Sequence, residues 1–443
     1  MRQKLGALLA LLIMGGGAQA RAQEVFWKRL GDTTLERLVS EVVTSNHDVL
    51  AARARLRGAR ASRLQAALDF APTVTATASY TRQRLSSAAF PGSVATAFPD
   101  QNVWDAGLAL SWELDVFGRI RKSTQGRGAL IAAAEEDVED LQVLLAAELA
   151  TAYFDLRGAQ DRLQVARRNA ENQQHTLDVT LQRLEAGRGN EFDSERGRAQ
   201  LNSTLAGIPQ LEASIDAVEH RIAVLIGQPA IGLDQENGEG TALPGLPDSI
   251  MVPNPDAVVR LRPDVRSAER QLAAGNAFVG AAKAAYLPRI SLGGGLGYVG
   301  SSFDALGNSN TPRYAIGPVI SWPALNLGRV KAGVDVARAQ EAEADAYYRK
   351  TQLQASEEIA TSVVAYNKAR RSLAYLDIAA RASERAAALA RLRFDEGLTD
   401  FLQVLDAERT MLEAQDRLAT GRTAATNGLI AVYRALGGAA IVP

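Results

Sequence analysis

Four segments of the chain alternate between apolar and polar residues, the period-two pattern of a β-strand with one apolar face. They cover about residues 73–82, 103–114, 289–299 and 313–322. Each is long enough to cross a bilayer as a tilted strand, which takes about 9 to 11 residues. Aromatic residues stand near the ends of the apolar faces, where a membrane interface would lie: Tyr80, Trp104, Trp112, Tyr298, Tyr314 and Trp322. The pattern predicts four transmembrane strands in two hairpins.

One such strand alone would more often belong to an amphipathic sheet on a soluble core, but four in succession with aromatic ends favour the membrane. Segments 82–102 and 300–311 are rich in small, polar and turn-forming residues and are the expected external loops. Four strands cannot close a barrel, because the smallest membrane barrels have about 8 and an open edge in lipid leaves backbone groups without partners. The chain must therefore form an oligomer, and either two or three copies would meet this requirement.

Elsewhere the apolar residues recur with the 3.6-residue period of a helix. Residues 122–186 contain no proline and would span roughly 100 Å as one helix. Gly187 stands where this helix would end, and Asn190 can cap a return helix over 192–226. The second half offers the same parts: a helix over 331–396, Gly397, a cap at Thr399 or Asp400, and a return helix over 401–436. A solvated coiled-coil rod would show the same helical pattern, but the four predicted membrane strands argue against this alternative.

Shorter helices are expected before the first strand of each half, over 34–44, 48–70 and 264–286. The last two end before Pro72 and Pro288, because a proline disfavours helix in the residue that precedes it.

The second half of the chain repeats the first. Asp48 and Asp264 are 216 positions apart, and Trp112 and Trp322 are 210 apart. Solenoid repeats have periods of about 20 to 50 residues, so this spacing indicates duplication of a domain-sized module. We predict a first repeat over 23–227, a connecting equatorial segment over 228–262 and a second repeat over 263–443.

Residues 1–22 read as a secretory signal, with Arg2 and Lys4 before an apolar run and small residues at a cleavage site after position 20 or 22. The apolar run is about ten residues, whereas a spanning helix needs roughly 20. The chain has no cysteine, which excludes disulfides, thiolate metal sites and an acylated cysteine after the signal. Its 50 acidic and 49 basic residues nearly cancel, so no global field favours nucleic acid.

Catalytic and cofactor motifs are missing from the sequence. His47, His175 and His220 are far apart, and no zinc-protease, phosphate-loop or nucleophile motif occurs. The run Gly293-Gly294-Gly295-Leu296-Gly297 lies inside an alternating strand, so small lumen-facing residues explain it better than a phosphate loop. Segment 234–240 lacks the last glutamate of a calcium loop. We therefore expect no enzyme activity, cofactor or metal site.

Five short motifs occur in order along nearly the whole mature chain: residues 26–32, Arg262-Pro263-Asp264-Val265, Tyr286-Leu287-Pro288, residues 322–329 and Val404-Leu405-Asp406-Ala407-Glu408. With these motifs the chain resembles the outer-membrane efflux protein family, the TolC-like exit ducts, and most closely its NodT-type branch. The resemblance implies a mixed α/β membrane protein, a homotrimer with a 12-stranded β-barrel in the outer membrane continued by a 12-helix periplasmic α-barrel. Each half would contribute two strands and one long helical hairpin.

The resemblance also implies where the aperture and the docking tips lie. The family closes its tunnel with rings of leucine and aspartate, which fall on Leu402 and Asp406 of this chain. A second family aspartate falls on Gln403 and a tyrosine on Phe394, so a weaker hydrogen-bonding network is expected at this gate. Without the resemblance, Asp406 would be read as a solvated carboxylate on a helix face. The docking tips for an adaptor would be the two hairpin turns, comprising Gly187, Arg188, Gly189, Asn190, Gly397, Leu398, Thr399 and Asp400.

The function implied is that of an exit duct, which passively conducts drugs or other small toxic compounds across the outer membrane. Its partners would be outer-membrane lipid, a periplasmic membrane-fusion adaptor and an inner-membrane pump of the proton-driven RND class. Outer-membrane components of type I protein secretion or metal efflux remain alternatives, and a secreted coiled-coil protein is a remote one. The NodT-type pattern usually carries a lipidated cysteine. This chain has none, so we expect it to be unlipidated and held by its barrel.

Overall fold

The computed structural model describes residues 26–86, 99–230, 244–252 and 254–438. The predicted signal segment, most of the first external loop and segment 234–240 lie outside these residues. The chain divides into two compact units. The strand unit comprises Ala54–Glu135 and Ser267–Arg349, and the hairpin unit comprises Met1–Arg53, Glu136–Arg266 and Lys350–Pro443. Each unit takes residues from both halves of the duplicated sequence, so compact units and sequence repeats are different divisions of the chain.

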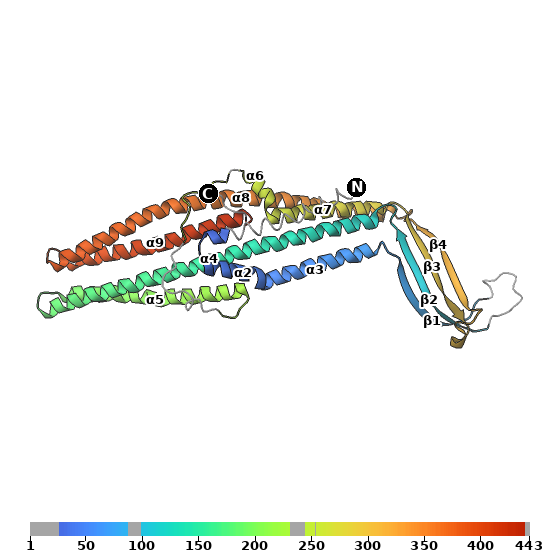
Figure 1. The fold of residues 1–443 in the computed structure, drawn as a ribbon, viewed down its shortest axis with the longest axis horizontal. Coiled ribbons are helices and arrows are strands. Elements are labelled where there is room, and N and C mark those ends of the chain that lie inside the picture. The colour runs from blue at the N-terminus through green and yellow to red at the C-terminus, as the bar shows by residue number, and fades with distance from the viewer. Residues whose placement is uncertain (1–25, 87–98, 231–243, 253, 439–443) are drawn as a thin grey trace. The chain divides into compact units, whose positions relative to one another are not determined.

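The strand unit contains one antiparallel sheet in the order β1-β2-β3-β4, seen side by side in Figure 1. Its strands are β1 Thr73–Gln83, β2 Gln101–Leu114, β3 Arg289–Gly300 and β4 Pro312–Ser321. The four strands predicted from alternation are therefore present. A short 3-10 helix, η2 Phe303–Ala305, lies in the second loop.

The register of the sheet puts most of the large apolar residues of the four strands on one face. Tyr80 is paired with Trp104, Leu108 with Leu296, and Leu296 with Tyr314. This face is open within the chain, and Tyr314 is 87% exposed. The other face carries small and polar residues. Such a sheet has one surface suited to a nonpolar environment and one suited to water.

Helices α3 His47–Leu68 and α7 Pro263–Ala284 precede the two strand pairs. They correspond to the helices expected before Pro72 and Pro288. In the strand unit, the Trp112 indole donates a hydrogen bond to the Phe70 carbonyl at 2.8 Å, and the Trp322 indole donates to the Tyr286 carbonyl at 3.0 Å. The same hydrogen bond, from a tryptophan near a strand end to a carbonyl at a helix end, thus occurs in both halves.

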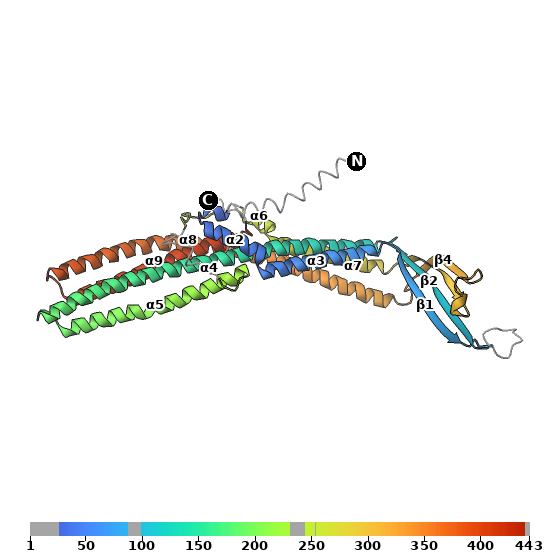
Figure 2. The ribbon, with the colours of Figure 1, turned by 60° about the horizontal axis from the view of Figure 1, so that its bottom comes forward.

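The two long helices are α4 Arg119–Glu185 and α8 Leu327–Asp395, of 67 and 69 residues. Their return helices are α5 Glu191–Ile226 and α9 Phe401–Ala435. In the hairpin unit, Figures 1 and 2 both show α5 beside α4 and α9 beside α8. An apolar cluster of Ala170, Leu177, Leu181 and Leu201 joins α4 to α5.

One local feature was not expected from the sequence. Helix α6 Pro255–Leu261 lies in the segment predicted to be a connector, and the Asn254 side chain caps it at Ala257 N. Helix α5 continues through Pro209, in agreement with the return helix predicted over 192–226, although this proline cannot donate a backbone hydrogen bond to the preceding turn. No helix in the described part of the chain is long and apolar enough to cross a membrane.

The N-terminal motif packs on the hairpin unit. The rings of Phe26 and Trp27 lie 4.4 and 4.7 Å from the Tyr433 ring. Asp32 accepts from Leu35 N at 3.0 Å, which caps α2 Thr33–Ser45, and from the Tyr153 hydroxyl at 2.6 Å. The motif therefore joins the start of the described chain to α9 and α4.

Candidate functional site

The two hairpin turns have the geometry that their sequences predict. Gly187 and Gly397 adopt φ values of 68° and 75°, which a residue with a side chain rarely takes. Asn190 accepts from Phe192 N at 2.9 Å, and Asp400 accepts from Gln403 N at 3.1 Å. The glycines and caps thus have structural roles.

Beside these caps, each turn exposes one side chain that takes no part in capping. Arg188 is exposed in the first turn, together with Gly189 and the capping Asn190, and Leu398 is 64% exposed in the second. Thr399 is half-buried, and its hydroxyl lies 2.5 Å from Gln403 Oε1. Each turn therefore offers a small surface, cationic in the first hairpin and apolar in the second.

Three of the four predicted gate residues lie together on the first turns of α9. Leu402, Gln403 and Asp406 are exposed, and Leu402 and Gln403 lie four and three residues before Asp406, which places both beside it on the helix surface. Asp406 is paired with Arg409, whose Nη2 lies 2.9 Å from Asp406 Oδ1. This hydrogen bond and the Asp406 charge raise the pKa of Arg409.

Phe394 does not join that group. Its ring packs 5.5 Å from the Phe401 ring, and the Arg183 guanidinium lies 4.1 Å from the Phe394 ring centroid. Arg183 also donates to the Phe394 carbonyl at 3.2 Å. Phe394 therefore lies at a contact between α4 and the end of α8.

The aromatic residues of the sheet form two groups. Near the loop ends, the Tyr80 and Trp104 rings are 4.7 Å apart and Phe303 lies 5.4 Å from Trp104. Tyr298 and Tyr314 also lie near that end, both exposed. Trp112 and Trp322 lie at the opposite end and bond to the helix carbonyls described above.

The polar face of the sheet carries an ion pair that spans a strand. Arg313 on β4 binds Asp105 on β2, with β3 between them. On β3, Gly297 is paired with Arg313 and Val299 with Asp105, so the residue opposite Arg313 has no side chain to block its path toward Asp105. Gly107 faces Gly297, and a Cβ at Gly107 would lie 2.6 Å from the Leu296 carbonyl oxygen. The glycine-rich run therefore serves close strand contact, as small residues in a strand do.

Comparison with known proteins gives the family. A model described as outer membrane efflux protein matches residues 38–228 and 255–438. The chain belongs to the outer membrane efflux protein family. This confirms the resemblance drawn from the motifs.

Relatives of this efflux-family chain match along most of their length. The solvent efflux pump outer membrane protein SrpC of Pseudomonas putida is 30% identical over 422 residues, covering 95% of this chain and 88% of the relative. Nodulation protein T of Rhizobium leguminosarum bv. trifolii is 28% identical over 394 residues, covering 89% and 83%.

Solved structures agree with the fold. The outer-membrane channel OprN is 41% identical with a TM-score of 0.85, covering 93% of this chain and 92% of that one. The CmeC outer membrane channel of Campylobacter jejuni is 22% identical with a TM-score of 0.85 and covers 94% and 88%.

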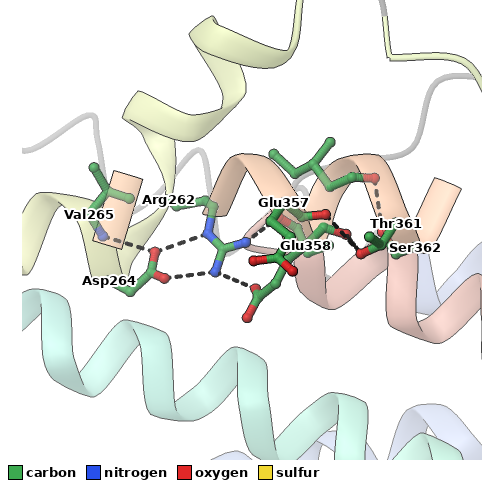
Figure 3. Close-up of polar contacts among 9 residues, drawn as sticks. Arg262, Asp264, Val265, Glu357, Glu358, Thr361 and Ser362 are labelled. Carbon is green, nitrogen blue, oxygen red and sulfur yellow. Dashed lines mark hydrogen bonds and ion pairs between the residues drawn. The ribbon is translucent and has the colours of Figure 1, made fainter. Parts of the chain in front are cut away.

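A buried charge cluster in this efflux-family chain was not expected from the sequence. Arg262 is buried and donates to both carboxylate oxygens of Asp264 at 3.0 and 2.7 Å, to Glu358 at 2.8 Å and to the Ala435 carbonyl at 2.8 Å. Figure 3 shows its guanidinium between the two carboxylates. Burial lowers the pKa of Arg262, but the bonds to Asp264 and Glu358 outweigh burial and the pKa is raised.

The same charge cluster also influences the pKa of a neighbouring carboxyl group, that of Asp140. Burial, the main cause, and the charge of Asp264 raise the pKa of Asp140 to about 6, although Arg262 acts in the opposite direction. Arg266 binds Glu136 and Glu139 close by. The motif at Arg262 thus marks a structural junction of α4, α7, α8 and the end of α9.

Sequence reasoning also missed Glu408. Its carboxylate is 1% exposed and accepts from Arg391 Nε at 2.6 Å. A signal was available, because Glu408 lies on the same helical stripe as Phe401, Val404 and Met411, which are buried. A carboxylate within an apolar stripe indicates a buried polar contact.

Proposed function

We propose that this chain is the outer-membrane exit duct of a tripartite efflux system. It would passively conduct small toxic compounds received from a periplasmic adaptor and an inner-membrane pump of the RND class. The observation that carries the proposal is the combination, in a member of the efflux family, of a sheet with one exposed apolar face and two helical hairpins with exposed tips. The apolar face suits lipid, and the polar face suits a water-filled lumen.

Three copies would complete the wall. Among the described residues, strands β1 and β4 are the edges of the sheet and have a neighbouring strand on one side only. An edge in lipid requires a partner strand, because its backbone groups find no water there. Joined edge to edge, three sheets would form a barrel of twelve strands, continued by twelve helices from the hairpins.

Helix α8 supports the same assembly. Leu353, Val364 and Tyr375 recur every eleven residues and are 73%, 58% and 72% exposed. An eleven-residue spacing keeps side chains on one face of a helix. Ile378, Leu389 and Leu392 continue this exposed stripe. A helix of a neighbouring copy would cover it, as apolar helix stripes require.

The relatives suggest the class of cargo. SrpC is a solvent efflux pump outer membrane protein, and TtgI of Pseudomonas putida is a toluene efflux pump outer membrane protein. We propose small apolar or amphipathic compounds as the cargo of this chain. In such a passive duct, Leu402 with Asp406 on α9 would set the aperture.

Docking of the adaptor would occur at the hairpin turns. The side chains of Arg188 and Leu398 are exposed there, while their backbone N–H groups donate to the Arg183 and Arg393 carbonyls at 2.8 Å and close the preceding helices. The chain has no cysteine to acylate. The β-barrel itself would therefore anchor the trimer in the membrane.

The test is fractionation followed by reconstitution. The protein should be recovered from outer membranes as a trimer that dissociates on heating, and it should conduct ions in a planar bilayer. Cells that depend on it should lose solvent or drug tolerance when it is deleted. Recovery as a soluble monomer would overturn the proposal.

A further inference from the structure

A hollow of about 230 Å³ lies between α8 and the end of α9 in the hairpin unit. Its lining consists of three alanines, three side chains that carry oxygen, and one arginine. Pockets for drug-sized ligands usually enclose roughly 300–1,000 Å³, so this hollow suits a smaller group.

The first half of the chain shows why the hollow exists. Three residues of the first half correspond to shorter ones in the lining, 210 positions later: Asp155, Arg221 and Leu225 correspond to Ala365, Ala431 and Ala435. The backbone at this level is alike in both halves, because the equivalent glycines Gly227 and Gly437 end α5 and α9 with φ values of 78° and 67°. The hollow therefore results from shorter side chains on a corresponding backbone.

In the first half, a guanidinium group occupies the corresponding place. Arg221 on α5 pairs there with Glu148 on α4. Glu148 is equivalent to Glu358, which lines the hollow. The second half therefore has the carboxylate of this ion pair, but Ala431 stands where the first half has the cation.

The oxygen atoms of the lining are available as acceptors. Glu358 Oε2 accepts from Arg262 at 2.8 Å, and the carboxylate is 44% exposed, which leaves Oε1 for a second donor. The Thr361 and Ser362 hydroxyls donate to carbonyls of the preceding turn at 2.8 and 3.2 Å (Figure 3). Because a hydroxyl has a single proton, both hydroxyl oxygens remain acceptors toward the hollow. Three such acceptors suit a group that only donates, as an alkylguanidinium does.

Arg434 is the cation of the lining, and its charge disfavours a second cation. Its side chain is exposed, so its guanidinium can extend into water, where salt screens the charge. An anion would gain this donor but would also meet the Glu358 carboxylate and two hydroxyls whose protons are engaged elsewhere. The lining as a whole therefore favours a cationic donor over an anion.

We propose that the hollow is a binding site for a small molecule that carries an alkylguanidinium group. The planar group would donate to Glu358 Oε1 and to the Thr361 and Ser362 hydroxyl oxygens, while the alkyl part would lie against Ala431 and Ala435. Ethylguanidinium is the matching probe, because Ala431 supplies the Cβ and ethylguanidinium supplies the remaining atoms of an arginine side chain. The site goes beyond the proposed function, since the purified protein would bind the probe whether or not it conducts.

Binding to the purified, full-length protein tests the site. Saturation-transfer NMR with ethylguanidinium should show binding that saturates at about millimolar concentration, as expected for a fragment of this size. Ala431→Arg fills the hollow from within the chain and should abolish the signal. The matched control, Ala424→Arg, adds the same charge at an exposed position seven residues earlier on α9 and should leave binding unchanged. Neutral ethylurea and anionic ethanesulfonate should give no signal with the wild type.

A single thiol tests the charge preference separately. The chain has no cysteine, so Ala431→Cys places a unique thiol in the hollow. After correction for reactivity toward a free thiol, a cationic methanethiosulfonate reagent should modify it about tenfold faster than an anionic one. Ethylguanidinium should slow the cationic reagent. Ala424→Cys should show neither the preference nor the protection.

Several results would overturn the proposal. Binding of ethylguanidinium to Ala431→Arg as to the wild type would place the site elsewhere, and equal binding of ethylurea would show that charge is not recognised. Faster modification by the anionic reagent would make the hollow an anion site at Arg434. A thiol at position 431 that resists both reagents in the native trimer would show that a neighbouring copy covers the hollow. By contrast, protein that binds ethylguanidinium but forms no channel would refute the duct and support this site.

Discussion

Asn46 and Arg262 occupy equivalent places in the two halves of the chain, 216 positions apart, and make the same contact with different chemistry. The Asn46 amide donates to the Leu225 carbonyl at 2.8 Å, and the Arg262 guanidinium donates to the Ala435 carbonyl at 2.8 Å. Leu225 and Ala435 are themselves equivalent, 210 positions apart. Both contacts join the start of α3 or α7 to the end of a return helix.

The halves differ in what surrounds this contact. Asn46 also accepts from Asp48 N and Val49 N and so caps α3 with a neutral group. Arg262 instead binds the carboxylates of Asp264 and Glu358. Both halves thus have the backbone contact and a carboxylate at each equivalent position, Asp48 with Asp264 and Glu148 with Glu358, but only the second half places a cation at this contact. Losing a hydrogen bond between neutral groups costs less folding free energy than removing a buried charge, because the latter leaves charged partners unpaired.

Arg262→Ala should therefore be the most damaging change. Removing the buried cation leaves Asp264 and Glu358 without it, which costs about 3–5 kcal/mol, whereas Asn46→Ala should cost about 1–3 kcal/mol. Thermal unfolding and trimer yield measure both losses. Arg260→Ala, at an exposed position two residues away, should have little effect. Equal losses at Asn46 and Arg262 would remove the distinction between the halves.

The charge cluster should also make stability depend on pH through Asp140. Its pKa is about 6 in the folded chain, above the unfolded value of about 3.9. A raised pKa means that the protonated form favours folding, so this stabilisation is complete below about pH 4 and is lost as pH rises through 6. The loss is at most about 3 kcal/mol, since one pKa unit corresponds to about 1.4 kcal/mol.

Asp140→Asn tests this dependence, because the amide resembles the protonated acid and does not ionise. The variant should match the wild type in unfolding temperature near pH 4 and exceed it near pH 7.5. Asp137 is an exposed carboxylate nearby, and Asp137→Asn serves as the control. Its unfolding temperature should not diverge from that of the wild type between pH 4 and pH 7.5. A constant difference between Asp140→Asn and the wild type across this range would exclude Asp140 as the titrating group.

The sequence predicted those parts of the molecule that depend on local pattern. Strand alternation, the helical period and the turn glycines Gly187 and Gly397 correspond to observed elements. The local pattern does not predict side-chain partners that are far apart in the chain. Arg262 pairs with Glu358, 96 positions away, and Thr176 contacts Glu408, 232 positions away. The Arg409 partner of Asp406 is only three residues away, a spacing at which opposite charges on a helix can pair.

The roles assigned to the gate residues remain predictions, and the comparison of halves sharpens their test. Asp406 is equivalent to Arg196 of the first half, 210 positions earlier. Asp406→Ala should raise single-channel conductance or antibiotic leakage about twofold or more, because a ring of three carboxylates would be lost from the aperture. Arg196→Ala should leave both unchanged. Identical conductance of the Asp406→Ala and wild-type channels would argue against an aperture at this position.

The smallest expected effect concerns a hollow in the second half. Glu148 binds Arg221 in the first half, and the equivalent of Arg221 is Ala431. A hollow of about 230 Å³ beside Ala431 is lined by Glu358, Thr361, Ser362, Ala365, Arg434 and Ala435. Figure 3 shows Glu358, Thr361 and Ser362 in succession along α8. The second half therefore lacks the cation that occupies this place in the first.

Ala431→Arg would restore that cation next to Glu358, and Arg221→Ala would remove it from the first half. Exposed ion pairs contribute about 0–1 kcal/mol, so each change should move the unfolding temperature by no more than a few degrees, upward for Ala431→Arg and downward for Arg221→Ala. Arg434 lies three residues from the new arginine and its charge reduces the gain. In a Glu358→Gln background, which by itself weakens the Arg262 cluster, Ala431→Arg should give no gain over Glu358→Gln alone, since the carboxylate is the source of the gain. A larger effect than that of Arg262→Ala would mean that the hollow, rather than the buried arginine, distinguishes the second half.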